Sequence, residues 1–281
     1  MIPSGAAKVA GVMGWPVAHS LSPRLHGHWL EVMGIDGAYV PFAVRPENLK
    51  TALHALAPLG VSGVNLTVPH KEAALPLMAE LDEAARAIGA VNTVSVTPGG
   101  ALRGGNTDAY GFLQHLKAAA PSWRGDAGAA VILGAGGAAR AAVHALREAG
   151  VTDIRLVNRT PERAQALLPD FGLKPAVFSL GEANRAFSDA ALLVNATSLG
   201  MKGAPPLELD LDGLPEGCIV YDLVYAPLET PLLAAARARG HPCVDGLGML
   251  IHQAVPAFEA FFGARPRVTA ETRRVLLEPG D

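Results

Sequence analysis

The stretch Ala130-Val131-Ile132-Leu133-Gly134-Ala135-Gly136-Gly137-Ala138-Ala139-Arg140 decides the fold. A short apolar strand runs into a glycine turn and then into an alanine-rich helix that ends near Gly150. In this setting Gly134 permits a tight turn, Gly136 lets a pyrophosphate approach the backbone, and Ala139 lets helix and strand pack closely. The helix N-terminus would face the phosphates. The pattern predicts a doubly wound, dinucleotide-binding sheet, with the cofactor at Gly134, Ala135, Gly136, Gly137 and Ala138.

The next predicted strand, 154–157, indicates which dinucleotide is bound. It runs into Asn158, Arg159 and Thr160, with Arg163 one helical turn later. An enzyme that prefers NAD usually carries Asp or Glu here, to bond the ribose 2′-hydroxyl. Guanidinium groups and a hydroxyl instead neutralise and bond a 2′-phosphate, so we expect NADP. The alternative is an exposed, basic start of a helix.

Two further strands of this half end in polar or aromatic residues. Residues 191–194 lead into Thr197, and the strand beginning at Cys218 leads into Leu223 and Tyr225. Ligands of an open parallel sheet lie beyond the carboxyl ends of its strands. We therefore expect Thr197 and Leu223, with Gly246 after a last short strand, to border the nicotinamide half of the cofactor.

The N-terminal part alternates predicted strands and helices. We expect strands at 8–14, 38–44 and 90–96, one ending near residue 66, and helices at 23–33, 46–59 and 81–88. Units of this length favour a mostly parallel sheet. The prediction is an α/β protein with a cleft between two domains. A substrate-binding domain spans 1–110 and is completed by C-terminal helices at 247–281, and a Rossmann NADP-binding domain spans 111–246.

The run Asn65-Leu66-Thr67-Val68-Pro69-His70-Lys71 places hydroxyl, imidazole and amine side chains at the end of a predicted strand. Pro69 suits the first position of a helix, which would place Lys71 in its first turn. The helix dipole and burial both favour the neutral amine there, so Lys71 is a candidate general acid/base. Asp108 beside it would orient the amine and share its proton. The plainer readings are a solvated lysine and an aspartate that only caps a helix.

Three more polar residues in this half are candidates for ligand binding. Ser20 and Ser22 flank a predicted helix entrance, where their hydroxyls can bond an anionic or polyhydroxylated ligand. Ser22 followed by Pro23 also fits an N-cap. Asn92 lies in an apolar strand, where its amide needs partners, so it either binds a ligand or bonds the backbone within the core.

Composition limits the classes of function. The 281 residues suffice for two domains; half are hydrophobic and 17% are charged, which favours a compact globular chain. A net charge of -3 gives no basic field for nucleic acid. Cys218 and Cys243 support neither a disulfide framework nor a metal site. The sequence shows no leader and no run of ~18 apolar residues, so we expect a soluble, cytoplasmic protein without a metal.

Eight ordered motifs resemble the shikimate dehydrogenase family over nearly the whole chain. They are Gly14-x-Pro16-x-x-His19-Ser20-x-Ser22-Pro23, Asn65 to Lys71, Gly89-Ala90-Val91-Asn92-Thr93, Gly105 to Asp108, Gly134 to Ala138, Asn158-Arg159-Thr160, Asn195-Ala196-Thr197-Ser198 and Asp245-Gly246-x-x-Met249-Leu250-x-x-Gln253. Departures are Gly27, where many members carry Asn, and Leu223, where Met is common.

The resemblance implies NADPH-dependent reduction of 3-dehydroshikimate to shikimate, within chorismate and aromatic amino acid biosynthesis. It implies Lys71 and Asp108 as the catalytic pair. The substrate carboxylate and hydroxyls would be held by Ser20, Ser22, Thr67, Asn92, Tyr225 and Gln253, with Asp108 also in contact. The partner would be a small molecule, and the protein a monomer or homodimer.

Two alternatives stay open. One is a quinate and shikimate dehydrogenase with relaxed use of substrate or cofactor. The other, from a different class, is a non-catalytic NADP-binding regulatory protein on the same fold, because a fold alone does not fix a function.

Overall fold

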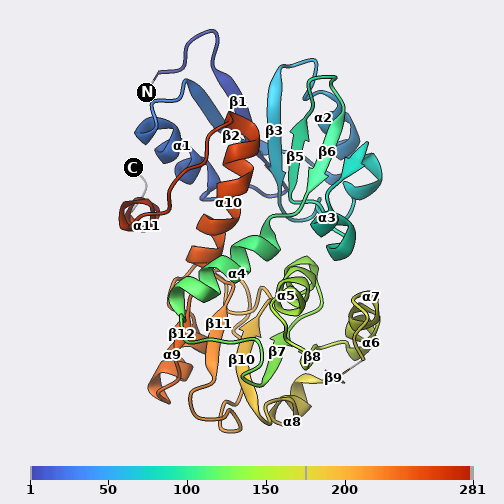
Figure 1. Cartoon of the computed structure of the whole chain (residues 1–281), viewed down its shortest axis with the longest axis vertical. Coiled ribbons are helices and arrows are strands. Elements are labelled where there is room, and N and C mark those ends of the chain that lie inside the picture. The colour runs from blue at the N-terminus through green and yellow to red at the C-terminus, as the bar shows by residue number, and fades with distance from the viewer. Residues whose placement is uncertain (1, 175, 279–281) are drawn as a thin grey trace. The chain divides into compact units, whose positions relative to one another are not determined.

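A computed structural model describes residues 2–174 and 176–278 (Figure 1). The chain divides into two compact units. Unit 1 contains residues 1–107 and 250–281, and unit 2 contains residues 108–249. Each unit is built on its own six-stranded sheet. The predicted α/β class, with a Rossmann-type sheet in the second unit, is confirmed.

Unit 1 has the strand order β2-β1-β3-β5-β6-β4. Its sheet is mixed: β1 pairs in parallel with β2 and β3, and β4 with β6, whereas β5 is antiparallel to both β3 and β6. The elements are β1 Lys8–Gly14, α1 Ser22–Val32, β2 Gly37–Ala43, a 3-10 turn Pro46–Asn48, α2 Leu49–His54, β3 Val61–Leu66, a 3-10 turn Leu75–Leu77, β4 Glu80–Leu81, α3 Glu83–Ile88, β5 Thr93–Val96, β6 Leu102–Gly105, α10 Leu247–Phe262 and α11 Ala270–Leu277.

Alternation along β3 separates the two faces of this sheet. Val64 and Leu66 enter a core that also holds Leu49 and Leu53 of α2. Gly63 lies on the opposite face, beneath α10, where an added Cβ would come within 2.5 Å of the Phe261 ring. The glycine therefore lets α10 approach the strand closely, and Asn65 shares this face. Figure 1 shows α10 crossing the sheet of unit 1.

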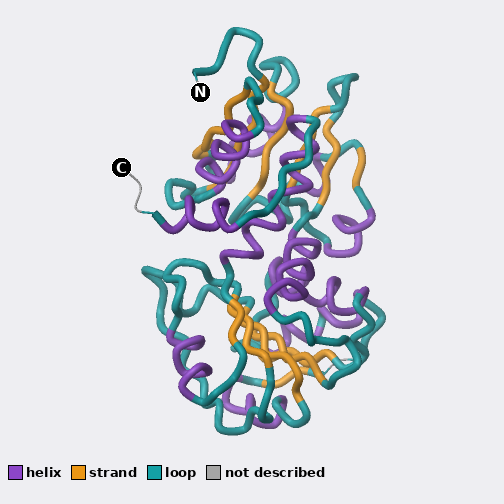
Figure 2. Tube along the Cα trace, turned by 60° about the vertical axis from the view of Figure 1, so that its left-hand side comes forward, coloured by secondary structure: helices purple, strands orange, loops and turns teal. Residues whose placement is uncertain are grey.

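Unit 2 contains an all-parallel sheet in the order β12-β11-β10-β7-β8-β9. Helices cover both faces, as Figure 2 shows. The elements are α4 Asp108–Ala119, β7 Ala129–Leu133, α5 Gly137–Glu148, β8 Ile154–Val157, α6 Pro161–Gln165, α7 Leu167–Asp170, β9 Val177–Phe178, a 3-10 turn Leu180–Glu182, α8 Ala183–Ala186, β10 Ala190–Asn195, β11 Ile219–Asp222, α9 Pro231–Ala238 and β12 Cys243–Val244.

The core of unit 2 explains why its strands read as continuous apolar runs. All five residues of β7 are buried, as are five of the six in β10. A parallel sheet covered on both faces has no solvent side for polar residues to occupy. One face packs on α8 and α9, through residues such as Phe187, Leu232 and Leu233.

Candidate active site

The segment after β3 differs from its prediction. No helix begins at Pro69; the Val68–Pro69 bond is cis and residues 68–74 form turns. The backbone shows why a helix does not form: the Lys71 carbonyl accepts from the Val91 amide at 2.8 Å, so it is bonded across the fold instead of four residues ahead. The helix-dipole argument for Lys71 is therefore wrong. Lys71 lies half-buried in a turn that is tied to the strand region leading to Asn92.

Asp108 is buried and opens α4. Lys71 belongs to unit 1 and Asp108 to unit 2. The structure thus assigns the two predicted catalytic groups to a turn of one unit and to the first helical residue of the other, and their pairing stays a prediction.

Ser20 and Ser22 lie at the entrance of α1, as expected. Ser22 is not the N-cap: Leu21 occupies that position, and no side chain caps the helix. The Ser22 amide instead donates to Ser20 Oγ at 3.3 Å. Since its hydroxyl is not used as a cap, the plainer reading of Ser22 is wrong.

Asn92 is held by side chains and one amide. The Thr107 amide donates to Asn92 Oδ1 at 2.8 Å, and Asn92 Nδ2 donates to Thr107 Oγ1 at 3.0 Å and to Gln253 Oε1 at 3.5 Å. Thr107 Oγ1 also lies 3.3 Å from Gln253 Oε1. The structure thus brings Asn92 and Gln253, two predicted substrate-binding residues, together in unit 1. Gln253 lies on α10, whose apolar residues pack on the sheet of unit 1 as the sequence predicted.

Thr67, the remaining predicted substrate-binding residue of unit 1, follows β3 directly and is half-buried. Its amide donates to the Met13 carbonyl at 2.9 Å, which ties the end of β3 to β1. An added Cβ at Gly14 would come within 2.4 Å of the Thr67 methyl group. Gly14, the first residue of the motif that contains Ser20 and Ser22, therefore leaves space for the Thr67 side chain.

Tyr39 and Asn65 are buried neighbours of this cluster that the sequence analysis did not assign to the site. The Tyr39 hydroxyl donates to Asn65 Oδ1 at 2.7 Å, and Asn65 Nδ2 donates to the Asn92 carbonyl at 3.2 Å and to Thr93 Oγ1 at 3.1 Å. Burial raises the pKa of Tyr39 well above its ordinary value, and a smaller opposing effect comes from a side-chain hydrogen bond with Ser22. The signal in the sequence was a tyrosine and an asparagine within apolar strands.

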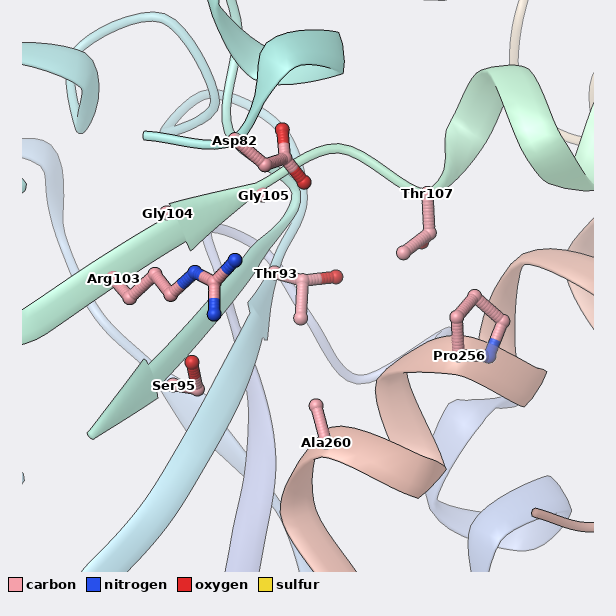
Figure 3. Close-up of a pocket in the computed structure, with 9 residues that line it drawn as sticks. All are labelled: Asp82, Thr93, Ser95, Arg103, Gly104, Gly105, Thr107, Pro256 and Ala260. Atoms are coloured by element: carbon pink, nitrogen blue, oxygen red, sulfur yellow. The ribbon is translucent and has the colours of Figure 1, made fainter. Parts of the chain in front are cut away.

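A hollow of about 260 Å³ adjoins the Asn92 cluster in unit 1. Thr93 and Ser95 of β5 and Arg103 of β6 line it from the sheet, and Pro256 and Ala260 line it from α10 (Figure 3). Thr107 also borders it, so the hydrogen-bonded residues around Asn92 reach its wall.

In unit 2 the glycine turn between β7 and α5 has the predicted form. Gly134 has φ 110°, a left-handed value that favours glycine, and an added Cβ would lie 3.1 Å from Thr197. Gly136 is the N-cap of α5, and at Gly136 and Gly137 an added Cβ would meet no atom within 4 Å. Ala135 and Ala138 are half-buried, and Ala139 is fully buried. The turn leaves open space beside the α5 N-terminus, where backbone amides can bind phosphate.

The residues after β8 also suit the predicted ligand. Arg159, Thr160 and Arg163 are exposed. The guanidinium groups of Arg159 and Arg163 make no hydrogen bond or ion pair with any residue in 2–174 or 176–278, whereas that of Arg155 pairs with Asp153 and Asp189. Asn158 Nδ2 donates to the Thr160 carbonyl at 2.7 Å and shapes this segment. Two guanidinium groups thus remain available for a phosphate.

The ends of β10 and β11 are fixed by a buried hydrogen-bond network. Asn195 Oδ1 accepts from the amide and hydroxyl of Thr197, at 3.0 and 2.7 Å. Asn195 Nδ2 donates to Asp222 at 2.9 Å, and Thr230 donates to the other carboxylate oxygen at 2.7 Å. Burial raises the pKa of Asp222, and these hydrogen bonds oppose that rise. Asp222 and Asn195 therefore hold the loops that carry Thr197 and Leu223.

Leu223 and Gly246 meet in unit 2. An added Cβ at Gly246 would come within 2.3 Å of the Leu223 carbonyl oxygen, so only glycine fits beneath that backbone. Tyr225, two residues further on, is half-buried, and burial raises the pKa of its phenol. The structure therefore brings together two of the three residues predicted to border the nicotinamide.

Comparison with known proteins decides the family. Residues 12–94 match the shikimate dehydrogenase substrate-binding domain, residues 120–201 match shikimate/quinate 5-dehydrogenase, and residues 246–277 match the shikimate 5′-dehydrogenase C-terminal domain. The chain is 56% identical to shikimate dehydrogenase (NADP⁺) of Paramagnetospirillum magneticum over 98% of this chain and 99% of that protein. It is 57% identical to the enzyme of the same name from Rhodospirillum rubrum, over 98% of each chain. The chain belongs to the shikimate dehydrogenase family.

Solved structures of the shikimate dehydrogenase family share this fold. Shikimate 5-dehydrogenase of Thermus thermophilus, in complex with NADP(H) and shikimate, is 41% identical with a TM-score of 0.85, covering 96% of this chain and 98% of that one. Quinate dehydrogenase of Corynebacterium glutamicum, in complex with NAD, is 35% identical with a TM-score of 0.87, covering 96% and 99%. The resemblance read from the motifs is confirmed.

Metal binding and membrane insertion are two other properties to which the described side chains and helices are relevant. Within 2–174 and 176–278, no group of three or more His, Cys, Asp or Glu side chains is arranged to hold a metal ion. Among the helices of that same part, none is both long enough and apolar enough to cross a membrane.

Proposed function

We propose that this protein is an NADP-dependent shikimate dehydrogenase, which catalyses the reversible reduction of 3-dehydroshikimate to shikimate. The observation that carries the proposal is the combination of family membership along nearly the whole chain with two unpaired, exposed arginines after β8. The near-complete coverage of the chain matters because proteins that share a fold can differ in function. Here both the substrate-binding domain and the C-terminal domain match the family.

The cofactor proposal rests on unit 2. The open turn at Gly136 and Gly137 leaves room for a pyrophosphate at the N-terminus of α5. Arg159 and Arg163 would neutralise the 2′-phosphate, with Thr160 adding a hydroxyl. The two relatives that are 56% and 57% identical carry NADP⁺ in their names. The remaining residues proposed to contact NADP are Gly134, Ala135, Ala138, Asn158, Thr197, Leu223 and Gly246.

The substrate proposal rests on unit 1. Asn92, Gln253 and Thr107 form one hydrogen-bonded group, and the amide and hydroxyl donors of the residues around it can bind a polyhydroxylated ring. Ser20 and Ser22 at the entrance of α1 would bind the carboxylate of the substrate. Thr67, Asp108 and Tyr225 complete the proposed set.

Lys71 would supply the proton in the reduction. When bound, NADPH would supply the hydride for the ring carbonyl carbon. As negative charge develops on the carbonyl oxygen, the Lys71 ammonium donates a proton to that oxygen and becomes a neutral amine. Asp108 would hold the ammonium in position and favour its protonated form before transfer. In the oxidation direction the neutral amine accepts the same proton.

A steady-state assay tests the proposal. The purified protein is mixed with shikimate and NADP⁺, and the absorbance of the reduced nicotinamide is followed. Parallel reactions contain quinate in place of shikimate, and NAD⁺ in place of NADP⁺. We expect the highest kcat/KM with shikimate and NADP⁺. Binding of NADP⁺ without turnover of either acid would favour a regulatory NADP-binding protein, and a preference for quinate with NAD⁺ would favour the activity named for the Corynebacterium relative.

A further inference from the structure

A buried chain of hydrogen bonds runs from Tyr39 on β2 to Asn92, which directly precedes β5. Tyr39 on β2 is in register with Ala10 on β1, and Ala10 is in register with Gly63 on β3. Ala10 carries only a methyl group and Gly63 no side chain, which leaves the phenol ring room to extend across β1. Its hydroxyl then reaches Asn65, two residues beyond Gly63.

The strand register carries the contact onward. Asn65 on β3 lies opposite Thr93 on β5. Asn65 Nδ2 donates to Thr93 Oγ1 at 3.1 Å, and Thr93 Oγ1 donates to Asn92 Oδ1 at 2.9 Å. The hydroxyl of Tyr39 is thus linked through two side chains to the amide of a proposed substrate contact.

The direction of each bond in this chain is fixed. Asn65 Nδ2 faces the Asn92 carbonyl, which can only accept, so Asn65 Oδ1 faces the phenol. The Tyr39 hydroxyl must therefore donate to Asn65, and its oxygen can only accept from Ser22. The one phenol sets the orientation of an amide on β3 and of a hydroxyl at the start of α1.

We propose that Tyr39 is a positioning residue for the substrate, acting through Ser22 on one side and through Asn65 and Thr93 on Asn92 on the other. This inference rests on the proposed function. The whole chain of hydrogen bonds is buried: Tyr39, Asn65, Thr93 and Asn92 are each at most 7% exposed. Buried polar groups that lose a partner turn to others, since leaving them unsatisfied is unfavourable.

The substitution Tyr39→Phe tests the inference, because it removes the hydroxyl and keeps the ring. We expect the KM for shikimate to rise about five- to tenfold, the value of one lost hydrogen bond, with kcat and the KM for NADP⁺ within about twofold of the wild type. The matched control is His26→Phe. His26 stacks directly on Tyr39, and neither of its ring nitrogens has a partner among the described residues, so its KM for shikimate should stay within about twofold.

Two further variants separate positioning from a general loss of packing. Thr93→Val removes the hydroxyl that links the Asn65 and Asn92 side chains while Tyr39 stays intact, and should raise the KM for shikimate as Tyr39→Phe does. Thr93→Ser keeps the hydroxyl, so its KM for shikimate should stay close to that of the wild type. In a double-mutant cycle, Tyr39→Phe should raise KM less in a Ser22→Ala background than in the wild type, because one route of its action is already lost.

The outcomes are distinct. A wild-type protein that binds NADP⁺ and does not turn over shikimate overturns the proposed function. An active wild type in which Tyr39→Phe and Thr93→Val leave the KM for shikimate unchanged overturns the role of Tyr39 alone. Equal rises in the KM for shikimate and for NADP⁺ would also overturn it, because they indicate a general structural defect. The Thr93 pair remains informative even if Tyr39→Phe does not fold.

Discussion

The ring of His26 stacks on the ring of Tyr39, with centroids 3.8 Å apart and planes 14° apart. His26 is fully buried, and both ring nitrogens lack a hydrogen-bond partner among residues 2–174 and 176–278. Burial lowers the pKa of His26 from 6.5 to about 3. The imidazole therefore serves as a neutral aromatic ring in the contact between α1, β2 and α10.

This contact predicts acid sensitivity. The unfolded chain binds a proton at His26 below pH 6.5, whereas the folded chain does not until about pH 3, so stability is full above pH 6.5 and falls as the pH drops. Between pH 7 and pH 5 this one group should remove about 2 kcal/mol from the free energy of unfolding. His26→Phe keeps the stacked rings but has no group that titrates, so its free energy of unfolding should not show this decrease between pH 7 and pH 5. Urea unfolding of both proteins at the two pH values measures it, and equal slopes would show that His26 is not the group responsible.

Gly246 provides a prediction for unit 2. Gly246→Ala would place a methyl group within 2.3 Å of the Leu223 carbonyl oxygen and within 2.7 Å of the Val224 carbonyl oxygen, and these are backbone atoms that cannot rotate away. We expect a loss of about 1–3 kcal/mol in the free energy of unfolding and a higher KM for NADP⁺. Gly181→Ala is the control, since an added Cβ there meets no atom within 4 Å; its stability should change by less than about 0.5 kcal/mol. Similar stabilities for the two variants would contradict the close approach at Leu223.

Cofactor choice should depend on Arg159. Arg159→Ala removes one of the two unpaired guanidinium groups, and a charge-assisted hydrogen bond to a phosphate is worth enough that the KM for NADP⁺ should rise at least about tenfold. The KM for NAD⁺, which lacks the 2′-phosphate, should change by less than about twofold. Arg185→Ala is the matched control, because Arg185 is an exposed arginine of the same unit that pairs with Glu182. Equal losses of NADP⁺ and NAD⁺ affinity would refute the assignment.

The sequence predicted local elements well where one pattern dominates. The strand 8–14 and the strand–turn–helix around Gly134 appear with nearly the expected bounds, because apolar runs and glycine turns act locally. The helix expected at Pro69 did not form, because the Lys71 carbonyl bonds Val91, twenty positions away in the chain. Likewise, Pro23 made Ser22 look like the N-cap of a helix that begins at Pro23. In the structure α1 begins at Ser22, one residue earlier, and Leu21 is the N-cap.

The sequence singles out polar residues of the candidate site but not the buried residues that hydrogen-bond to them. Asn92 and Gln253 stand out in apolar segments, so the sequence singles them out. Tyr39 and Asn65 also lie in apolar strands, but their contact with each other was not predicted, because it depends on the register of β1 with β2 and β3, which brings together residues 26 positions apart. A single sequence contains no direct record of register. Asp222 was missed for the same reason, since its partners Asn195 and Thr230 lie on separate segments.

We propose that Lys71 provides the proton that completes the reduction. The most direct measurement is kcat for shikimate oxidation by Lys71→Ala, with the dissociation constant for NADP⁺ measured by calorimetry on the same preparation. Lys50→Ala, an exposed lysine on α2, is the control and should keep wild-type kcat. For Lys71→Ala we expect kcat to fall at least about a hundredfold, with NADP⁺ affinity within about twofold of the wild type. A kcat for Lys71→Ala equal to that of the wild type would contradict it.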